Sequence, residues 1–467
     1  MLFDTPVYFC FLSVIVAVYW RLGWRSQNRF LLAASYFFYG WWDWRFLGLM
    51  IVSTTVDFWA GRKIGESAEH SARKRWLIVS LSVNLGFLGV FKYLGFFVQS
   101  FKNAAEMLGL HGLPLPLIQL ILPAGISFYT FQEIAYIVDV YKGKQEPARS
   151  FADYALFVSL FPHLIAGPIQ RPHHLLEQVR RPRRFDRTMF FDGMMLIAFG
   201  LFRKCVIADN CATLANAAFR GRLGYGFLPS FIAAFAFAFQ IYGDFSGYTD
   251  IARGSAKLMG FEFVVNFRQP YLAASVRDFW RRWHISLSTW LRDYLYIPLG
   301  GNRGGRVHTL LNLLVTMLLG GLWHGANWTF IVWGGIHGFW LAVERLFTEN
   351  ARWPLSRPVA KAISRAATLA VVGIAWIFFR SLSIGQALHV ISGFGHLAWD
   401  VSLLPALEFM CGLAILTIGM DLRLESRDEE YLFQNRPVYG LASATGLMAL
   451  TVLFGATDTN AFIYFQF

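Results

Sequence analysis

Charged residues are scarce in this 467-residue chain. Lys, Arg, Asp and Glu together make up 15% of the sequence, whereas hydrophobic residues make up 56%. A soluble globular protein carries about 25% charged residues. A soluble fold of this length could not hide so much apolar surface from water. The composition therefore predicts a polytopic, all-α membrane protein for which lipid is the main solvent.

The sequence also lacks the motifs of several function classes. Its four cysteines form no CxxC pair and no Cys/His spacing typical of metal ligands, so we expect no metal site. Neither the GxSxG of serine hydrolases nor the HExxH of zinc proteases occurs. The glycine-rich loop at 298–305 lacks the pattern of a phosphate loop. We expect no tightly bound cofactor.

Long runs without charge indicate where the chain crosses the bilayer. The longest runs from Val307 to Val343, and a helix needs about 20 apolar residues to span the hydrocarbon core. This run can hold two membrane segments joined by a turn, which we expect at Gly320-Gly321 and Gly325. Together with shorter stretches it predicts about 11 membrane segments, some of them re-entrant. Three other uncharged runs are 107–132, 223–243 and 437–457, and the shorter apolar stretches are 7–20, 29–44, 46–60, 76–98, 152–169, 190–208, 367–384 and 402–420.

Among the charges that are present, basic residues dominate. Lys plus Arg number 42 against 29 Asp plus Glu, for a net charge of +13. They lie between apolar segments, most densely from Arg171 to Arg187. Short basic loops stay cytoplasmic and contact anionic lipid head groups. No nucleic-acid reading module accompanies the charge, so nucleic acid is not an expected partner.

Residues 242–306 are more polar than their surroundings, and apolar residues at helical spacing predict one amphipathic helix over 277–292. Its polar face would carry His284 among the basic residues Arg277, Arg281 and Arg292. Two interpretations stay open. The helix lies at the membrane interface with its arginines on phosphates, or it lines a site for an anionic ligand.

His324 lies within the longest uncharged run, in the segment Gly320-Gly-Leu-Trp-His-Gly-Ala-Asn327. A titratable side chain at membrane depth is costly and usually functional, although a hydrogen bond to a neighbouring helix is the alternative. A neutral histidine can accept a proton from a hydroxyl that attacks a thioester. His337 either lines the same cavity or only packs, and packing is favoured. A transporter or export component without bond chemistry is the rival class.

The sequence resembles the membrane-bound O-acyltransferase (MBOAT) superfamily, and it closely resembles the bacterial alginate O-acetylase branch of that superfamily. The resemblance covers almost the whole chain. It rests on eight segments in order: Ala34-Ser-Tyr-Phe-Phe-Tyr-Gly-Trp-Trp42, Pro123-Ala-Gly-Ile-Ser-Phe-Tyr-Thr-Phe-Gln132, Pro162-His-Leu-Ile-Ala-Gly-Pro168, Asp244-Phe-Ser-Gly-Tyr-Thr-Asp250, Phe279-Trp-Arg-Arg-Trp-His-Ile-Ser-Leu-Ser288, Asp293-Tyr-Leu-Tyr-Ile-Pro-Leu-Gly-Gly-Asn302, Leu322-Trp-His-Gly-Ala326 and Phe462-Ile-Tyr-Phe-Gln-Phe467.

The resemblance implies a single membrane domain over 1–467, a many-helix bundle around a central tunnel, with 242–306 contributing to the site. The family's invariant histidine falls on His324, and the second signature histidine of the branch falls on His284. Members of this branch take acetyl groups from a cytoplasmic donor, acetyl-CoA, across the bacterial inner membrane. Extracytoplasmic acetyltransferase partners then modify an exported polysaccharide. The resemblance favours alginate as this polysaccharide, and the alternatives are peptidoglycan or another exopolysaccharide. Arg277, Arg281 and Arg282 are weak candidates for binding the donor's phosphates.

Overall fold

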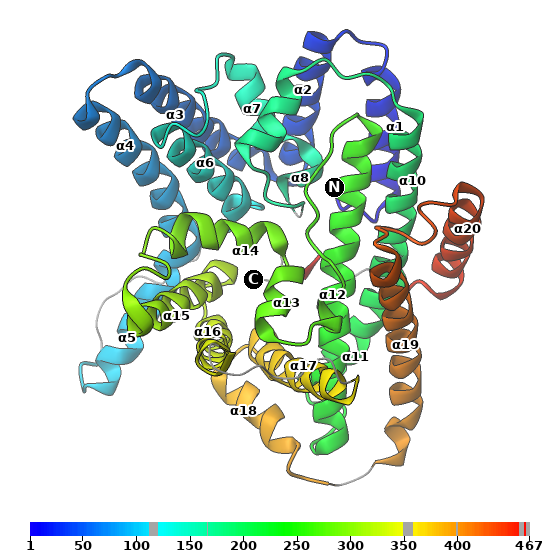
Figure 1. Ribbon diagram of the computed structural model, residues 1–467. Coiled ribbons are helices and arrows are strands. Elements are labelled where there is room, and N and C mark those ends of the chain that lie inside the picture. The colour runs from blue at the N-terminus through cyan, green and yellow to red at the C-terminus, as the bar shows by residue number, and fades with distance from the viewer. Residues whose placement is uncertain (112–119, 166, 349–357, 398–399, 457–461, 464–467) are drawn as a thin grey trace. The chain divides into compact units, whose positions relative to one another are not determined.

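The computed structural model describes residues 1–111, 120–165, 167–348, 358–397, 400–456 and 462–463. Every regular element within these residues is helical, as the sequence predicts (Figure 1). They fall into two compact units, residues 3–190 with 255–263 and residues 191–254 with 264–467. Two helices, α10 (Arg187–Phe202) and α12 (Phe227–Leu258), contain residues of both units. The expected single domain stays a prediction.

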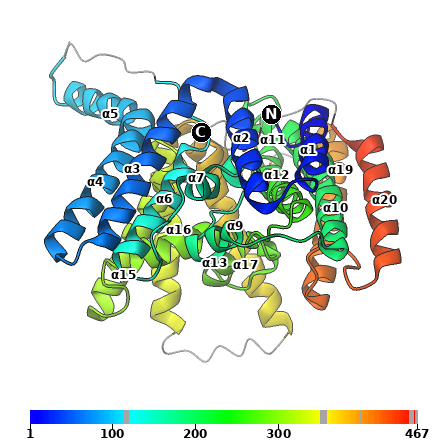
Figure 2. The same ribbon diagram turned by 90° about the horizontal axis from the view of Figure 1, so that it is seen from above.

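In the first unit, α3, α4 and α6 pack against one another (Figure 2). In this unit the motif at 123–132 contacts the motif at 162–168. Gln132 donates to His163 Nδ1 at 3.1 Å. Gly125 has φ +71, and a Cβ there would lie only 2.5 Å from Leu164 O. These motifs therefore serve packing. The elements of this unit are α1 (Pro6–Tyr19), α2 (Trp24–Asp43), η1 (Trp44–Phe46), α3 (Leu47–Glu66), α4 (His70–Leu88), η2 (Gly89–Tyr93), α5 (Leu94–Met107), α6 (Ile126–Tyr141), α7 (Phe151–Ser159), α8 (Phe161–Leu164), η3 (Pro172–Leu176) and α9 (Glu177–Arg180).

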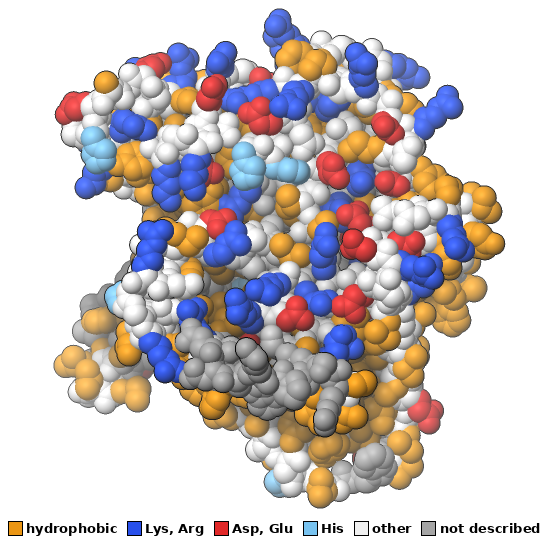
Figure 3. Space-filling model, in the orientation of Figure 1, with side chains coloured by type: hydrophobic (Ala, Val, Ile, Leu, Met, Phe, Trp, Pro, Cys, Tyr) orange, Lys and Arg blue, Asp and Glu red, His pale blue; other side chains and the backbone are white. Residues whose placement is uncertain are grey.

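Basic side chains are numerous on the face drawn in Figure 3, but part of the arginine-rich segment at 171–187 is structural. Arg183 donates to Asn28 Oδ1 and to the Tyr19 hydroxyl, and its guanidinium lies 4.5 Å from the centre of the Phe261 ring. These contacts tie the segment to α1, α2 and the residues that follow α12. Lipid contact is therefore not the sole role of this cluster.

The second unit contains the segments that the sequence links to chemistry. Its elements, besides most of α10 and α12, are η4 (Arg203–Ala208), α11 (Asp209–Phe219), η5 (Pro270–Leu272), α13 (Val276–Arg282), α14 (Ile285–Leu291), η6 (Arg292–Tyr296), α15 (Gly305–His324), α16 (Trp328–Thr348), α17 (Pro358–Arg380), α18 (Ile384–Gly393), η7 (Val401–Leu403), α19 (Leu404–Arg427) and α20 (Pro437–Phe454).

Helices α15 and α16 form a tight hairpin, and glycine makes the close approach possible. A Cβ on Gly321 would lie 2.2 Å from Phe330 O, and one on Gly334 would lie 2.2 Å from Met317 O. Small residues at such crossings let helix backbones touch in a membrane. The turn expected at Gly320-Gly321 is wrong, because both residues lie inside α15; the hairpin turns after Gly325, the C-cap of α15.

Six helical segments of the described residues are long and apolar enough to cross a membrane. They are 70–107, 227–258, 305–324, 358–380, 401–427 and 437–454. Other expected stretches form shorter helices, such as the 14-residue α1 and the 9-residue α7. Parts of the expected segments lie outside the described residues, among them 112–119. The figure of about 11 segments stays a prediction.

Candidate active site

His324 is the last residue of α15 and is 4% exposed. Three aromatic rings meet its imidazole edge to face: Trp323, Trp333 and Phe379, at centroid distances of 4.9, 5.0 and 5.2 Å. The next residue, Gly325, could not carry a side chain, because a Cβ there would lie 2.1 Å from the Phe330 ring. The predicted catalytic histidine thus lies in an aromatic cage at a helix end.

His284 lies at a break in the chain and not on a continuous helix. The helix expected over 277–292 is wrong: α13 ends at Arg282, and α14 begins at Ile285. His284 has φ 43° and ψ 53°, the left-handed conformation that non-glycine residues rarely adopt. The break rotates its side chain inward, so it is fully buried, whereas Arg277 and Arg281 stay exposed. The expected stripe of basic residues around His284 therefore does not form.

The turn at His284 is held by the Asn266-Phe-Arg-Gln-Pro-Tyr271 motif. Ile285 N donates to the backbone oxygen of Asn266 at 2.9 Å, and Arg268 N donates to the backbone oxygen of Arg282 at 2.9 Å. The Asn266 side chain also contacts the imidazole, with 3.1 Å between Oδ1 and His284 Nδ1. These six residues belong to the polar segment 242–306, and the sequence alone indicates no separate role for them.

The two predicted catalytic histidines come together. The centroids of the His284 and His324 rings are 6.4 Å apart, with 57° between the ring planes. His284 directly precedes α14 and His324 is the last residue of α15, and both belong to the same compact unit. Burial lowers the pKa of His284 to about 3, so this imidazole is neutral at physiological pH. A neutral imidazole keeps one nitrogen lone pair available for a proton or a hydrogen bond.

His337, on α16, is fully buried and has the contacts of a packed core residue. Trp280 donates its indole N–H to His337 Nδ1 at 3.3 Å, and the Phe279 ring stacks on the imidazole with an interplanar angle of 7°. Its ring also lies 4.9 Å from Trp333, which in turn contacts His324. His337 therefore belongs to the wall behind the His324 cage.

The three candidate donor-binding arginines differ in their surroundings. Arg282 is paired with two carboxylates, Asp278 at 2.9 Å and Glu425 at 2.8 Å. Arg277 and Arg281 are exposed. A guanidinium already neutralised by two acids has less attraction left for a phosphate. Arg277 and Arg281 thus remain the better candidates of the three.

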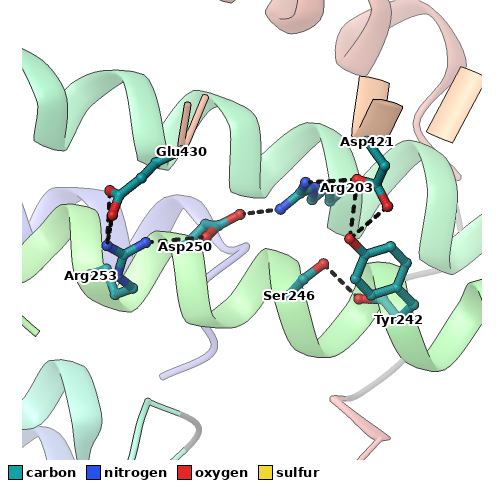
Figure 4. Close-up of polar contacts among 7 residues, drawn as sticks. All are labelled: Arg203, Tyr242, Ser246, Asp250, Arg253, Asp421 and Glu430. Carbon is teal, nitrogen blue, oxygen red and sulfur yellow. Dashed lines mark hydrogen bonds and ion pairs between the residues drawn. The ribbon is translucent and has the colours of Figure 1, made fainter. Parts of the chain in front are cut away.

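The acidic motif Asp244-Phe-Ser-Gly-Tyr-Thr-Asp250 forms buried ion pairs that the sequence analysis missed (Figure 4). Arg203 donates to Asp250 at 2.7 Å, and the Tyr242 hydroxyl donates to Asp421 at 2.9 Å. At the other end of the motif, Lys204 pairs with Asp209 and Asp244 at 2.7 and 2.9 Å. These pairs fasten α12 to η4 and α19. The acids of the motif indicate by themselves that cationic partners are needed, since a buried carboxylate must be paired. The sequence does not show which residues these partners are, because they lie far from the motif along the chain.

The described part of the C-terminal motif docks onto the same segment of α12. Ile463 N donates to Asp244 Oδ2 at 2.7 Å, and the Phe462 and Tyr248 rings lie 4.3 Å apart. The rest of the motif, residues 464–467, lies outside the described residues. Two of the sequence motifs therefore meet, and both serve to position α12.

Comparison with known proteins identifies the group to which this chain is related. The chain is 44% identical over 426 residues to the probable alginate O-acetylase of Pseudomonas syringae pv. tomato, covering 90% of this chain and 80% of the relative. It is 37% identical over 429 residues to the peptidoglycan O-acetyltransferase of Helicobacter pylori, covering 84% and 79%. A teichoic acid D-alanyltransferase of Streptococcus thermophilus is 29% identical over 241 residues, 47% of this chain and 56% of the relative.

The profile of the membrane-bound O-acyltransferase family matches residues 147–385, a range that contains both His284 and His324. Together with the helical fold, the apolar helices and the similarity over most of the chain, this match decides the family. The chain belongs to the membrane-bound O-acyltransferase family and is an acyltransferase.

Proposed function

We propose that this acyltransferase moves acetyl groups from a cytoplasmic thioester, acetyl-CoA, to a polysaccharide exported across the bacterial inner membrane. The observation that carries the proposal is the pair of buried imidazoles, 6.4 Å apart, inside the part of the chain that matches the family. The names of the relatives favour O-acetylation of a polymer, and the more similar ones favour alginate over peptidoglycan.

In the proposed mechanism His324 is the general base. It takes the proton of the acceptor hydroxyl, the oxygen forms a bond to the acetyl carbonyl carbon, and the carbon–sulfur bond of the thioester breaks. The proton held by His324 then passes to the departing thiolate, so that charge and atoms balance. His284 orients a substrate group beside this reaction. The aromatic cage of Trp323, Trp333 and Phe379 excludes water, which would otherwise hydrolyse the thioester.

Replacement of the base tests this mechanism. His324→Ala should lower acetylation of the exported polymer by about 10²–10⁴-fold, the usual contribution of general acid–base catalysis. His308→Ala is the matched control, because His308 lies on the same helix but is exposed. Both variants should insert into the membrane in normal amount. Wild-type acetylation by the His324→Ala protein would remove His324 from the mechanism.

The donor is tested with the purified protein in detergent. Incubation with acetyl-CoA labelled in the acetyl group should release free CoA, and the His324→Ala variant should release much less. The rival function, transport without bond chemistry, leaves the thioester intact in both proteins. Release of CoA that depends on His324 therefore separates the two classes.

The acceptor is tested in cells that lack the chain and in cells that regain it. If mannuronate polymers are the final acceptor, ester-linked acetate on alginate should fall and recover with the gene, while peptidoglycan acetylation stays constant. If acetylation of peptidoglycan falls and recovers while acetylation of alginate stays constant, peptidoglycan is the final acceptor. The extracytoplasmic acetyltransferase partners should be recovered with the wild-type chain after crosslinking across the membrane.

A further inference from the structure

Asn266 is buried, and its side-chain oxygen is the centre of a small hydrogen-bond cluster. Oδ1 accepts the backbone N–H of Ser286 at 3.2 Å and the Ser286 hydroxyl at 2.9 Å. The same oxygen lies 3.1 Å from Nδ1 of His284. The backbone oxygen of Asn266 accepts from Ile285 N at 2.9 Å. One residue therefore holds both the backbone and the ring of the His284 turn.

This arrangement fixes which nitrogen of His284 carries the proton. A backbone N–H can only donate, so the amide atom that faces Ser286 N must be the oxygen. An amide oxygen can only accept, so His284 Nδ1 must be the donor in its bond to Asn266. Since burial keeps this imidazole neutral, its single proton lies on Nδ1 and its lone pair lies on Nε2.

The lone pair has no partner among the residues that the structure describes. Nε2 of His284 is buried and makes no hydrogen bond to any of the described residues, and the same holds for Nδ2 of Asn266. Buried polar atoms are nearly always paired in folded proteins, and exceptions often mark a site where a ligand group belongs. The partner of Nε2 must be a donor, and a hydroxyl group is one.

We propose that Asn266 is a positioning residue that locks His284 in the tautomer with Nδ1–H, so that Nε2 accepts a hydrogen bond from a hydroxyl of the acceptor. This inference rests on the proposed function. The hydroxyl bound by His284 neighbours the one that loses its proton to His324, because a single O–H cannot serve both rings. The acceptor chemistry is therefore that of a polyol.

The same tautomer excludes another role for His284. A ring that stabilises the negative charge on the carbonyl oxygen must donate an N–H to that oxygen. The N–H of His284 is already bonded to Asn266, and Nε2 has none to give. His284 thus orients the acceptor, and stabilisation of the oxyanion falls to other groups.

The first experiment reads the tautomer directly. Nitrogen-15 NMR of histidine-labelled protein in detergent distinguishes protonated from bare ring nitrogens, and the His284→Gln variant identifies the His284 signals. We expect Nδ1 protonated and Nε2 bare in wild-type protein. Asn266→Leu should lose this preference, while Asn312→Ala, which removes another buried asparagine of the same unit, should keep it. A proton on Nε2 in the wild-type protein overturns the proposal.

The second experiment uses the pH dependence of CoA release, a property that a merely structural residue would not shift. The groups described around His284 are Asn266, Ser286, Phe245 on α12, and Trp323 and His324 on α15; among these only His324 has a side chain that can gain or lose a proton near neutral pH in water. Asn266→Asp keeps an acceptor at Nδ1 but adds a negative charge, which favours the doubly protonated ring.

A doubly protonated His284 cannot accept a hydrogen bond, so activity in Asn266→Asp should fall at a higher pH than in wild type. We expect the acid limb to move up by one pH unit or more, with a rise in KM for the acceptor that exceeds the loss in kcat. An unchanged profile in an active Asn266→Asp protein contradicts the role of Asn266. If the wild type releases no CoA at all, the proposed function fails, and the NMR result still decides the tautomer.

Discussion

The ring of Phe245 lies against the ring of His284, with centroids 4.6 Å apart and 87° between the planes. Phe245 belongs to the same acidic motif of α12 whose Asp244 and Asp250 form buried ion pairs. The motif therefore has two tasks, fastening α12 with its acids and supporting an imidazole with its aromatic ring. Neither task requires contact between the motif and a substrate.

Truncation of that aromatic support should weaken both stability and catalysis. Phe245→Ala removes a fully buried ring and leaves a cavity beside His284, a change that costs about 3–5 kcal/mol in well-packed proteins. Phe245→Leu fills much of the space and should cost less. Thermal unfolding in detergent and CoA release measure the two effects. Wild-type stability and CoA release in both variants would show that the ring contact does not matter.

The hairpin of α15 and α16 offers a test on adjacent residues. Gly334→Ala would place a Cβ 2.2 Å from Met317 O, whereas at Gly335 the nearest atom is a flexible Leu318 methyl at 3.5 Å. We expect Gly334→Ala to destabilise the protein by about 1–3 kcal/mol or more and to lower the folded yield. Gly335→Ala should resemble wild type in unfolding temperature and in activity.

The ion pairs around Lys204 should be important for stability. The Lys204 side chain is 1% exposed and lies between Asp209 and Asp244. Lys204→Met leaves two buried acids without this cation, and breaking a buried pair costs about 3–5 kcal/mol. Lys63→Met is the control, since the Lys63–Glu66 pair is exposed and such pairs contribute about 0–1 kcal/mol. A Lys204→Met protein as stable as wild type contradicts this expectation.

The pH dependence of stability should carry the signature of His284. Its folded-state pKa is about 3, below the ordinary value of 6.5, so between these values the unfolded chain binds a proton that the folded chain does not. Folding is therefore penalised as pH falls below 6.5, by about 1.4 kcal/mol for each unit. His284→Gln lacks this penalty. The stability difference between wild type and variant, measured by unfolding temperature, should narrow from pH 7.5 to pH 5.

The sequence predicted those features that depend only on which side chains are buried in lipid. A histidine in a long uncharged run, His324, and apolar stretches of membrane length both follow from the cost of polar groups in lipid. The local periodicity around His284 was misleading, because the residues on both sides of the break keep helical spacing. The break depends on Asn266, a residue 18 positions away, and on backbone pairing that no local pattern reveals.

The partners of the buried charged side chains also could not be predicted from the sequence. Asp250 finds its cation at Arg203, 47 residues earlier, and Tyr242 finds Asp421, 179 residues later. Each of these side chains is ordinary in its own neighbourhood. Only the packing of α12 against η4 and α19 brings the partners together, and a single sequence contains no record of which acid meets which base.

The left-handed backbone conformation at His284 lowers the stability of the folded protein, and it places the imidazole in its buried position. A side chain in that conformation costs about 1–2 kcal/mol, a cost that glycine does not incur. Exchange of His284 for glycine would thus relax the local backbone even as it removes the imidazole. The same exchange would leave a cavity where the buried imidazole now lies. Selection for thermal stability alone therefore acts on this position in two opposite directions, through the conformation of the backbone and through the packing of the ring.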